Sequence, residues 1–410
     1  MTAPDDVPAT PPPRRRVSVF AAVALVLAGV ALIGGALVAR GGPVPSTAPA
    51  SATEGPVASS PGAPASPGAS ATESPTATIV VPPPGSPSTG YLVLPADLAD
   101  RAAKAAKGVE PWASALAQLK DFAETALGES PQPSASLDIP GTEGPFVDDT
   151  ATAYGLGLAY AVTGDIRYAE GARRYIRAWV STTKGLVNAC PTDGSCQTSL
   201  IVARVVPDFV FAADLIRPSG VFTVADDTEF RTWLHDLILP ALPIRPNNWG
   251  DAGNFSRAVI TDYLGDKAGF AEALDEWRTR MDLVASDGHL PEEVRRGTAG
   301  MLYTQEALQY KVAVARLAEL RGVDLWSHVG KNGGTLEKAL GVLETYWFHP
   351  TAWPWNSHVS VPPPGPMWEI VYQHYQDPAW PPIFLVRRPY GNAGHSAIRW
   401  TTMTNGIPIK

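Results

Sequence analysis

The chain has 410 residues, with 32 Lys and Arg against 40 Asp and Glu, and a formal net charge of −8. Residues 1–90 contain four Arg and four acidic residues, so the acidic balance belongs entirely to the part that follows. Because a nucleic-acid-binding domain is expected to be basic, this balance excludes that class. Long-range attraction of an acidic polymer is also excluded, so anion recognition would need a local cluster of cations.

An uncharged stretch of 23 residues runs from Val17 to Ala39 and follows three arginines, Arg14 to Arg16. It is long enough to cross a bilayer core of about 30 Å as a helix. The positive flank predicts that residues 1–16 stay in the cytoplasm and that the rest is exported. We therefore predict a signal anchor at 17–39 in a single-pass protein of the cell membrane. The alternative is a cleaved signal peptide and a secreted protein, although the apolar region of such a peptide is usually shorter.

Residues 40–90 are almost wholly Pro, Ser, Ala, Thr, Gly and Val, and the segment has no aromatic residue before Tyr91. Too little apolar surface is present to offset the entropy of ordering such a segment. We predict a disordered linker over 40–90 that spaces a folded domain, residues 91–410, from the membrane. All 12 tryptophans and both cysteines lie in that domain.

The pattern of the domain predicts helices almost throughout and few strands. The expected helical segments are 98–127 (broken near 108–111), 150–162, 167–180, 199–216, 226–239, 254–264, 267–284, 297–321 and 335–348. Gly164-Asp165 and Gly265-Asp266 indicate tight antiparallel hairpins. The last 60 residues, rich in Pro and Trp, are expected to be irregular and to close over the helices. Such pairs build either an open solenoid or a closed ring, and the absence of a shared repeat signature favours an all-α (α/α) toroid.

Cys190 and Cys196 bracket the short polar loop CPTDGSC. Two cysteines alone make a poor metal site, and four-ligand zinc spacing is absent, so no metal site is predicted. In an exported chain a disulfide that closes the loop is the favoured reading, with two free thiols as the alternative.

Two stretches carry candidate chemistry. The first, Pro246-Asn247-Asn248-Trp249-Gly250, stands just before a predicted helix. One asparagine there suits a helix cap, while paired amides beside an aromatic ring also suit a sugar carboxylate and hydroxyls. The second stretch runs from Asp287 to Tyr303 and reads DGHLPEEVRRGTAGMLY. Arg296 and Tyr303 are seven positions apart, which places both on one face of a helix. The alternative interpretation is a charged helix start without a function, with Tyr303 in the core.

These stretches, in this order, resemble those of the alginate lyase family of helical-toroid polysaccharide lyases. The resemblance covers most of residues 95–390. It includes the segment from Asp149 to Tyr154, the Asn247–Gly250 motif, the block ending at Tyr303, and Gly322-Val323-Asp324-Leu325-Trp326. It implies β-elimination on a uronate-containing, alginate-like polysaccharide, with Tyr154 among the residues that bind substrate.

The resemblance also implies a role for each residue of the two motifs. Asn248 would help to neutralise the uronate carboxylate, Tyr303 would transfer the protons, and Arg296 would favour the tyrosinate and bind substrate. Asn247 would contact substrate. One departure matters: well-studied members carry a histidine directly after the second asparagine, where this chain has Trp249. Since an indole neither accepts a proton nor carries charge, either another histidine such as His289 serves, or Tyr303 acts alone, or activity is lost. Trp249 could instead stack on a sugar ring.

Further candidates are weaker. Arg388 could add positive charge to a substrate cleft. The alternative interpretation is a solvated surface residue without a role in binding. No phosphate-binding glycine loop and no nucleophile elbow occurs, so no nucleotide, nucleic acid or organic cofactor is predicted. The expected partners are an anionic polysaccharide and, through one N-terminal helix, the membrane. Two rivals stay open: a glycan-binding protein that has lost catalysis on this scaffold, and a glycoside hydrolase that uses paired carboxylates.

Overall fold

The computed structural model describes residues 81–194, 196–392, 394 and 396–409. The predicted cytoplasmic N-terminus, the signal anchor at 17–39 and the linker up to residue 80 lie outside this range. Among the residues described, no helix combines the length and apolar character that a membrane span requires.

The described chain is mostly helical, as predicted. Its α-helices are α2 (Pro95–Ala105), α3 (Trp112–Leu127), α4 (Glu143–Thr163), α5 (Ile166–Thr182), α6 (Gln197–Ile216), α7 (Val224–Trp233), α8 (Asn248–Leu264), α9 (Lys267–Met281), α10 (Pro291–Val294), α11 (Gly300–Leu320), α12 (Leu336–Phe348), α13 (Met367–Tyr375), α14 (Pro381–Phe384) and α15 (Thr401–Thr404). Two short strands, β1 (Ser136–Asp138) and β2 (Gly185–Val187), pair in parallel.

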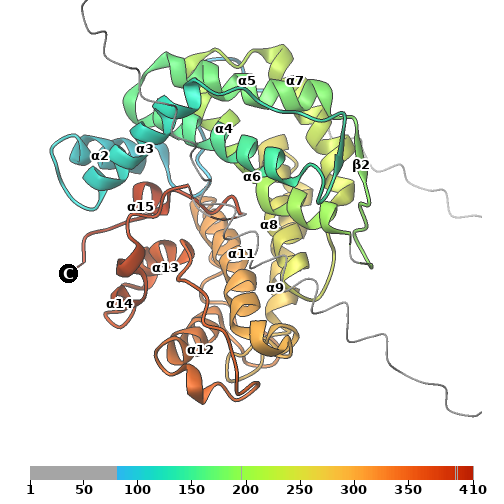
Figure 1. Cartoon of the computed structure of the whole chain (residues 1–410), viewed down its shortest axis with the longest axis vertical. Helices are drawn as coiled ribbons and strands as arrows, with labels where there is room; N and C mark the ends of the chain where they lie inside the picture. Colours follow the sequence, from blue (N-terminus) through green and yellow to red (C-terminus); the bar gives the residue numbers. More distant parts are fainter. Residues whose placement is uncertain (1–80, 195, 393, 395, 410) are drawn as a thin grey trace, which may run out of the picture. The chain divides into compact units, whose positions relative to one another are not determined.

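The helices form a ring (Figure 1). α4 packs against α6, α6 against α8, and α8 against α11. The ring continues from α11 to α13 and α15, and α15 contacts α3, which returns to α4. α5, α9 and α12 each pack on the helix next to them in sequence and so form an outer layer. This order of helix contacts is an (α/α) toroid, so the all-α toroid of the predicted fold class is confirmed.

Side-chain patterns explain which helices are inner and which are outer. α6 reads QTSLIVARVVPDFVFAADLI, and it is buried on almost every face. α5 buries one stripe, with Tyr168, Ala172, Tyr175 and Trp179 pointing inward, while its arginines face solvent or the edge of the ring. An all-round apolar helix belongs in an interior, and a helix with one apolar stripe belongs at a surface. Close contact between α4 and α6 needs Gly157, where an added Cβ would lie 3.0 Å from the Cα of Ala212.

Both predicted hairpins are confirmed. Gly164 and Gly265 follow α4 and α8 with φ angles of 73° and 75°, in the left-handed region that glycine adopts without steric cost. Asp165 and Asp266 come directly after them and accept hydrogen bonds from backbone N–H groups in the first turns of α5 and α9. One residue therefore ends each helix and the next begins its partner.

The chain enters the toroid earlier than predicted. The linker was expected to run to Gly90, but residues 88–90 are bound to Asp214 near the end of α6. This fully buried carboxylate accepts hydrogen bonds from Ser88 Oγ, from the N–H and hydroxyl of Thr89, and from the N–H of Gly90, and it pairs with Arg217. A buried carboxylate requires such partners, so the composition-based boundary is wrong for these three residues.

The C-terminal segment contains three short helices, α13 to α15, where irregular structure was expected. Trp368, Trp380 and Trp400 are buried within it. Arg399 donates to Asp208 of α6 at 3.0 Å, and both side chains are buried. This segment completes the ring by packing against its beginning.

Candidate active site

The first predicted motif forms the start of α8. Asn247 has an extended backbone, and its side-chain oxygen accepts a hydrogen bond from the N–H of Trp249 at 3.1 Å. Asn247 is therefore the helix cap, and α8 begins at Asn248, six residues earlier than predicted. Asn248 is fully buried.

The second predicted motif brings Arg296 and Tyr303 together. Arg296 precedes a 3-10 turn, Gly297–Ala299, and Tyr303 lies in the first turn of α11. The guanidinium carbon of Arg296 is 4.2 Å from the centroid of the Tyr303 ring, and both residues are partly exposed. The predicted proximity is correct, but Arg296 reaches the ring from the turn before α11, outside the helix.

A hydrogen-bonded cluster joins Asn248 to the helix that carries Tyr303. Asn248 Nδ2 donates to Glu306 Oε2 at 2.9 Å, and Glu306 Oε1 forms an ion pair with Arg204 of α6. Glu306 follows Tyr303 by three residues, so the two side chains project from the same face of α11. We call Asn248, Glu306 and Arg204 the amide–carboxylate cluster. Its members come from α8, α11 and α6, and Glu306 stands three residues along α11 from Tyr303.

A buried ionic layer supports the backbone of Asn248. Glu293 of α10, 1% exposed, accepts a hydrogen bond from the Asn248 N–H at 2.6 Å, and its other oxygen is buried without a partner. Asp251 lies nearby and accepts from both Arg280 and Lys311 at 2.6 Å. Burial, helped by the charge of Asp251, raises the pKa of Glu293 to about 7. The first turn of α8 thus rests on a carboxyl group that titrates near neutrality.

Trp249 is tied to the disulfide loop. Cys190 and Cys196 form the predicted disulfide. Arg245 donates to the carbonyl oxygens of Cys190 and Gly194 at 3.0 and 2.7 Å. Its guanidinium carbon lies 4.2 Å from the ring centroid of Trp249, which is 9% exposed. The loop therefore fixes an arginine over one face of the indole.

The remaining predicted site residues each have partners of their own. His289 bonds to Asp287 at 2.6 Å, and its ring centroid is 5.0 Å from that of Trp355. Tyr154 is buried in the core against Phe211, and burial raises its pKa. Arg388 uses two nitrogens on Glu369, at 2.8 and 2.9 Å, within the C-terminal segment, so it is not a solvated surface residue. These placements leave the roles assigned to the residues as predictions.

A proline-rich segment runs beside the candidate site. The N–H of Ser360 donates to the carbonyl oxygen of Thr298 at 2.8 Å. Gln305 of α11 donates to the Pro363 carbonyl at 3.0 Å and accepts from the Gly365 N–H at 2.9 Å. These contacts bracket Tyr303 in sequence, so residues 360–365 line the same stretch of α11.

Arg204 and Glu306 are functional candidates that sequence reasoning missed. A usable signal was present, because Arg204 and Asp208 are the charges within the otherwise apolar stretch 200–211. A charge within a buried helix needs a partner. The sequence did not show which acid that partner would be.

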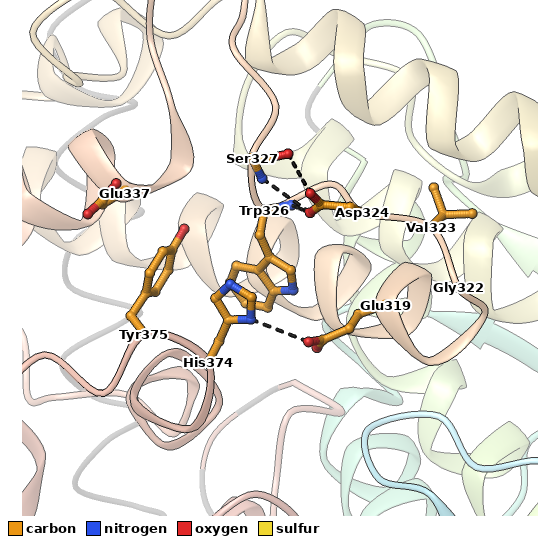
Figure 2. A pocket seen from close by; sticks show the side chains of 9 residues that line it. All are labelled: Glu319, Gly322, Val323, Asp324, Trp326, Ser327, Glu337, His374 and Tyr375. Carbon is orange, nitrogen blue, oxygen red and sulfur yellow. Dashed lines mark hydrogen bonds and ion pairs between the residues drawn. The ribbon is translucent and has the colours of Figure 1, made fainter.

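A pocket of about 500 Å³ lies at the opposite, C-terminal end of α11. Figure 2 shows His374 stacked on Trp326, with ring centroids 4.2 Å apart, and its Nδ1 3.3 Å from Glu319. The hydrogen bond from His374 and the ion pair with Arg316 lower the pKa of Glu319 to about 2. Sixteen residues of helix separate Glu319 from Tyr303, a rise of about 24 Å, so this pocket is not part of the candidate site.

Comparison with known proteins identifies a family and solved structures to which this chain is similar. The family model described as alginate lyase matches residues 144–353, just over half of the chain. The crystal structure of an alginate lyase from Bacteroides ovatus has a TM-score of 0.61 and 16% identity, covering 78% of this chain and 100% of that one. Alginate lyase A1-III from Sphingomonas species A1 has a TM-score of 0.64 and 16% identity, covering 79% and 98%. A tyrosine-to-phenylalanine variant of A1-III, complexed with a tetrasaccharide, has a TM-score of 0.63 and 14% identity, covering 79% and 97%. At these identities the structural likeness concerns the fold. No protein of curated function matches the sequence.

Proposed function

Because this chain belongs to the alginate lyase family of polysaccharide lyases, we propose that it cleaves a uronate-containing polysaccharide by β-elimination. In this reaction the C5–H bond breaks, a C4=C5 double bond forms, and the bond from C4 to the glycosidic oxygen breaks. One proton leaves C5 and one is delivered to the departing oxygen. The reaction therefore needs a base for the C5 proton and an acid for the departing oxygen, and one group can serve as both.

Tyr303 is the residue proposed for this proton transfer. Its phenol is partly exposed at the start of α11, and the guanidinium of Arg296 lies 4.2 Å from its ring. A cation at this position attracts the substrate carboxylate toward the phenol. This pair beside the amide–carboxylate cluster is the observation that supports the proposal most strongly.

The local charges also suit an acidic polymer better than the net charge suggests. Arg204 and Arg296 approach the candidate site from different elements, α6 and the turn before α11. The charge of Arg204 is balanced by its ion pair with Glu306, so the attraction for the polymer at this site rests on Arg296. Asn248 would contribute an amide donor; it is fully buried, whereas Glu306 and Arg204 are each 15% exposed.

The test is a panel of polyuronates and glycosaminoglycan-like polymers, followed by the ultraviolet absorbance of the unsaturated product. Wild type should generate the chromophore with at least one polymer. Tyr303→Phe should lose roughly 10²- to 10⁴-fold in rate, the usual contribution of a general acid–base residue. Tyr160→Phe, which removes the hydroxyl of a half-buried tyrosine at the far end of α4, is the matched control and should retain the wild-type rate. Equal activity of the two variants would remove Tyr303 from the mechanism.

A second candidate function is glycan binding without catalysis. The observation that favours it is Trp249, an indole covered on one face by Arg245, at a position where well-studied family members have a histidine. Binding to a polymer of the panel without any unsaturated product would support this candidate. New reducing ends without the chromophore would point instead to hydrolysis.

We also propose that the toroid works outside the cytoplasm, on a membrane-anchored or secreted chain. The disulfide between Cys190 and Cys196 supports an oxidising compartment. Protease added to intact cells should degrade an outward-facing domain. Full protection, with degradation only after lysis, would contradict this location.

A further inference from the structure

Glu306 occupies the donors that a uronate carboxylate would need. Asn248 Nδ2 donates to one of its oxygens, and Arg204 pairs with the other. An amide and a guanidinium that converge on a carboxylate are the groups expected to neutralise a bound uronate. Here they already neutralise a carboxylate of the protein itself.

The order of burial determines what an incoming ligand meets. Asn248 is fully buried, whereas Glu306 and Arg204 are each 15% exposed. A sugar that approaches Tyr303 along this face of α11 therefore meets Glu306 before it can reach the amide of Asn248. An ionised substrate carboxylate at this point would face a like charge that shares the same donors, and such juxtaposition strongly disfavours binding.

We infer that Glu306 is a specificity-determining residue that excludes an ionised carboxylate from Asn248, so that the site prefers a uronate whose carboxyl group is esterified. This inference rests on the proposed lyase function and names the substrate class within it. A neutral ester brings no second negative charge to Glu306, and its carbonyl oxygen still accepts a hydrogen bond.

The chemistry of elimination is consistent with an ester. The proton still passes from C5 to Tyr303, the C4–O bond breaks, the departing oxygen gains a proton, and the ester group is unchanged. Because an ester carries no charge, the carbanion-like transition state has one negative charge fewer than that of a free uronate. An ester therefore needs fewer neutralising groups in the transition state, which suits a site where the indole of Trp249 carries no charge.

The experiment compares one polyuronate with its methyl ester, using kcat/KM for the unsaturated product in wild type, Glu306→Gln and Glu306→Asp. Wild type should prefer the ester. Glu306→Gln removes the charge and keeps an oxygen for Arg204 or Asn248, so it should raise the ratio of kcat/KM on the free acid to kcat/KM on the ester roughly tenfold or more. Glu306→Asp keeps the charge and should keep the preference. Glu319→Gln, at the opposite end of the same helix, is the matched control and should leave the ester-to-acid ratio at the wild-type value.

The ratio of rates within one variant is insensitive to partial loss of folded protein. The ratio of dissociation constants for acid and ester oligosaccharides, measured in a Tyr303→Phe background, gives a second readout that does not depend on turnover. A wild type that cleaves the free acid at least as well as the ester overturns the inference and leaves the lyase proposal standing. A Glu306→Gln variant with the wild-type ratio of ester to acid rates has the same two consequences. A wild type that cleaves neither polymer, nor any other of the panel, overturns the lyase proposal itself.

Discussion

Replacement of Glu293 by glutamine should change how the stability of the toroid depends on pH. Glu293 is 1% exposed, and burial raises its pKa from 4.5 to about 7. Between these two values the unfolded chain ionises this carboxyl group while the folded chain keeps it protonated. The folded state then binds more protons, so this group makes the free energy of unfolding fall as the pH rises through the window. Above about pH 7 both states are ionised and the fall ends.

The size of the effect follows from the width of the window. The gap between 4.5 and about 7, at about 1.4 kcal/mol per pH unit, amounts to about 3 kcal/mol. Glutamine cannot ionise, and its carbonyl oxygen can still accept the hydrogen bond from the Asn248 N–H. Glu293→Gln should therefore gain about 3 kcal/mol relative to wild type between pH 4 and pH 8.

Denaturant unfolding followed by tryptophan fluorescence, repeated at several pH values, measures this difference. Glu292→Gln removes the same charge from the neighbouring, partly exposed position and serves as the control, with a much smaller change expected. A free-energy difference between Glu293→Gln and wild type that stays constant from pH 4 to pH 8 would refute the account of a buried, protonated carboxyl group beneath Asn248.

Three further predictions concern the supports of the site and of the chain entry. Asn247→Ala removes the cap of α8 and should lower the free energy of unfolding by about 1 kcal/mol, while Asn247→Asp should retain most of it, both measured by denaturant titration. Joint replacement of Cys190 and Cys196 by serine opens a short loop and should lower the free energy of unfolding by about 2 kcal/mol. Arg245 then loses its fixed position over Trp249, which should change the fluorescence of Trp249 in difference spectra against the oxidised protein. Asp214→Ala should release residues 88–90, seen as new cleavage in this stretch under limited proteolysis, whereas unchanged cleavage would mean that Asp214 does not hold it.

The sequence predicted the helical architecture well where local signals were strong. Gly164-Asp165 and Gly265-Asp266 combine a residue that ends a helix with one that begins the next, and both hairpins are present. The start of α8 was placed six residues too late because glycine and paired asparagines suggest a loop. In the structure Asn247 caps the helix, and the buried layer of Asp251, Arg280 and Lys311 stabilises its first turn. Because these stabilising residues lie on other helices, the sequence around residue 248 carries no pattern that marks the helix start.

In the candidate site too, contacts between residues close in sequence were predicted and contacts between distant residues were not. Arg296 and Tyr303 are close in sequence, and their proximity was predicted. The partners of Asn248 come from 45 and 58 residues away, Glu293 and Glu306, and Arg204 comes from another helix. Nothing in the spacing of these residues signals that they meet, because it is the packing of α6 and α11 against α8 that brings them together.

The Asp214 contacts have a mechanical consequence if the proposed anchor holds the chain at a membrane. Drag on the toroid, for instance from a long polymer moving past, would be resisted through the polypeptide that enters it. That tension would act first on the end of α6, a helix that packs against both α4 and α8, and only then on α2. Force would thus be shared among the inner helices, and the peripheral N-terminal helix would be spared from unravelling first.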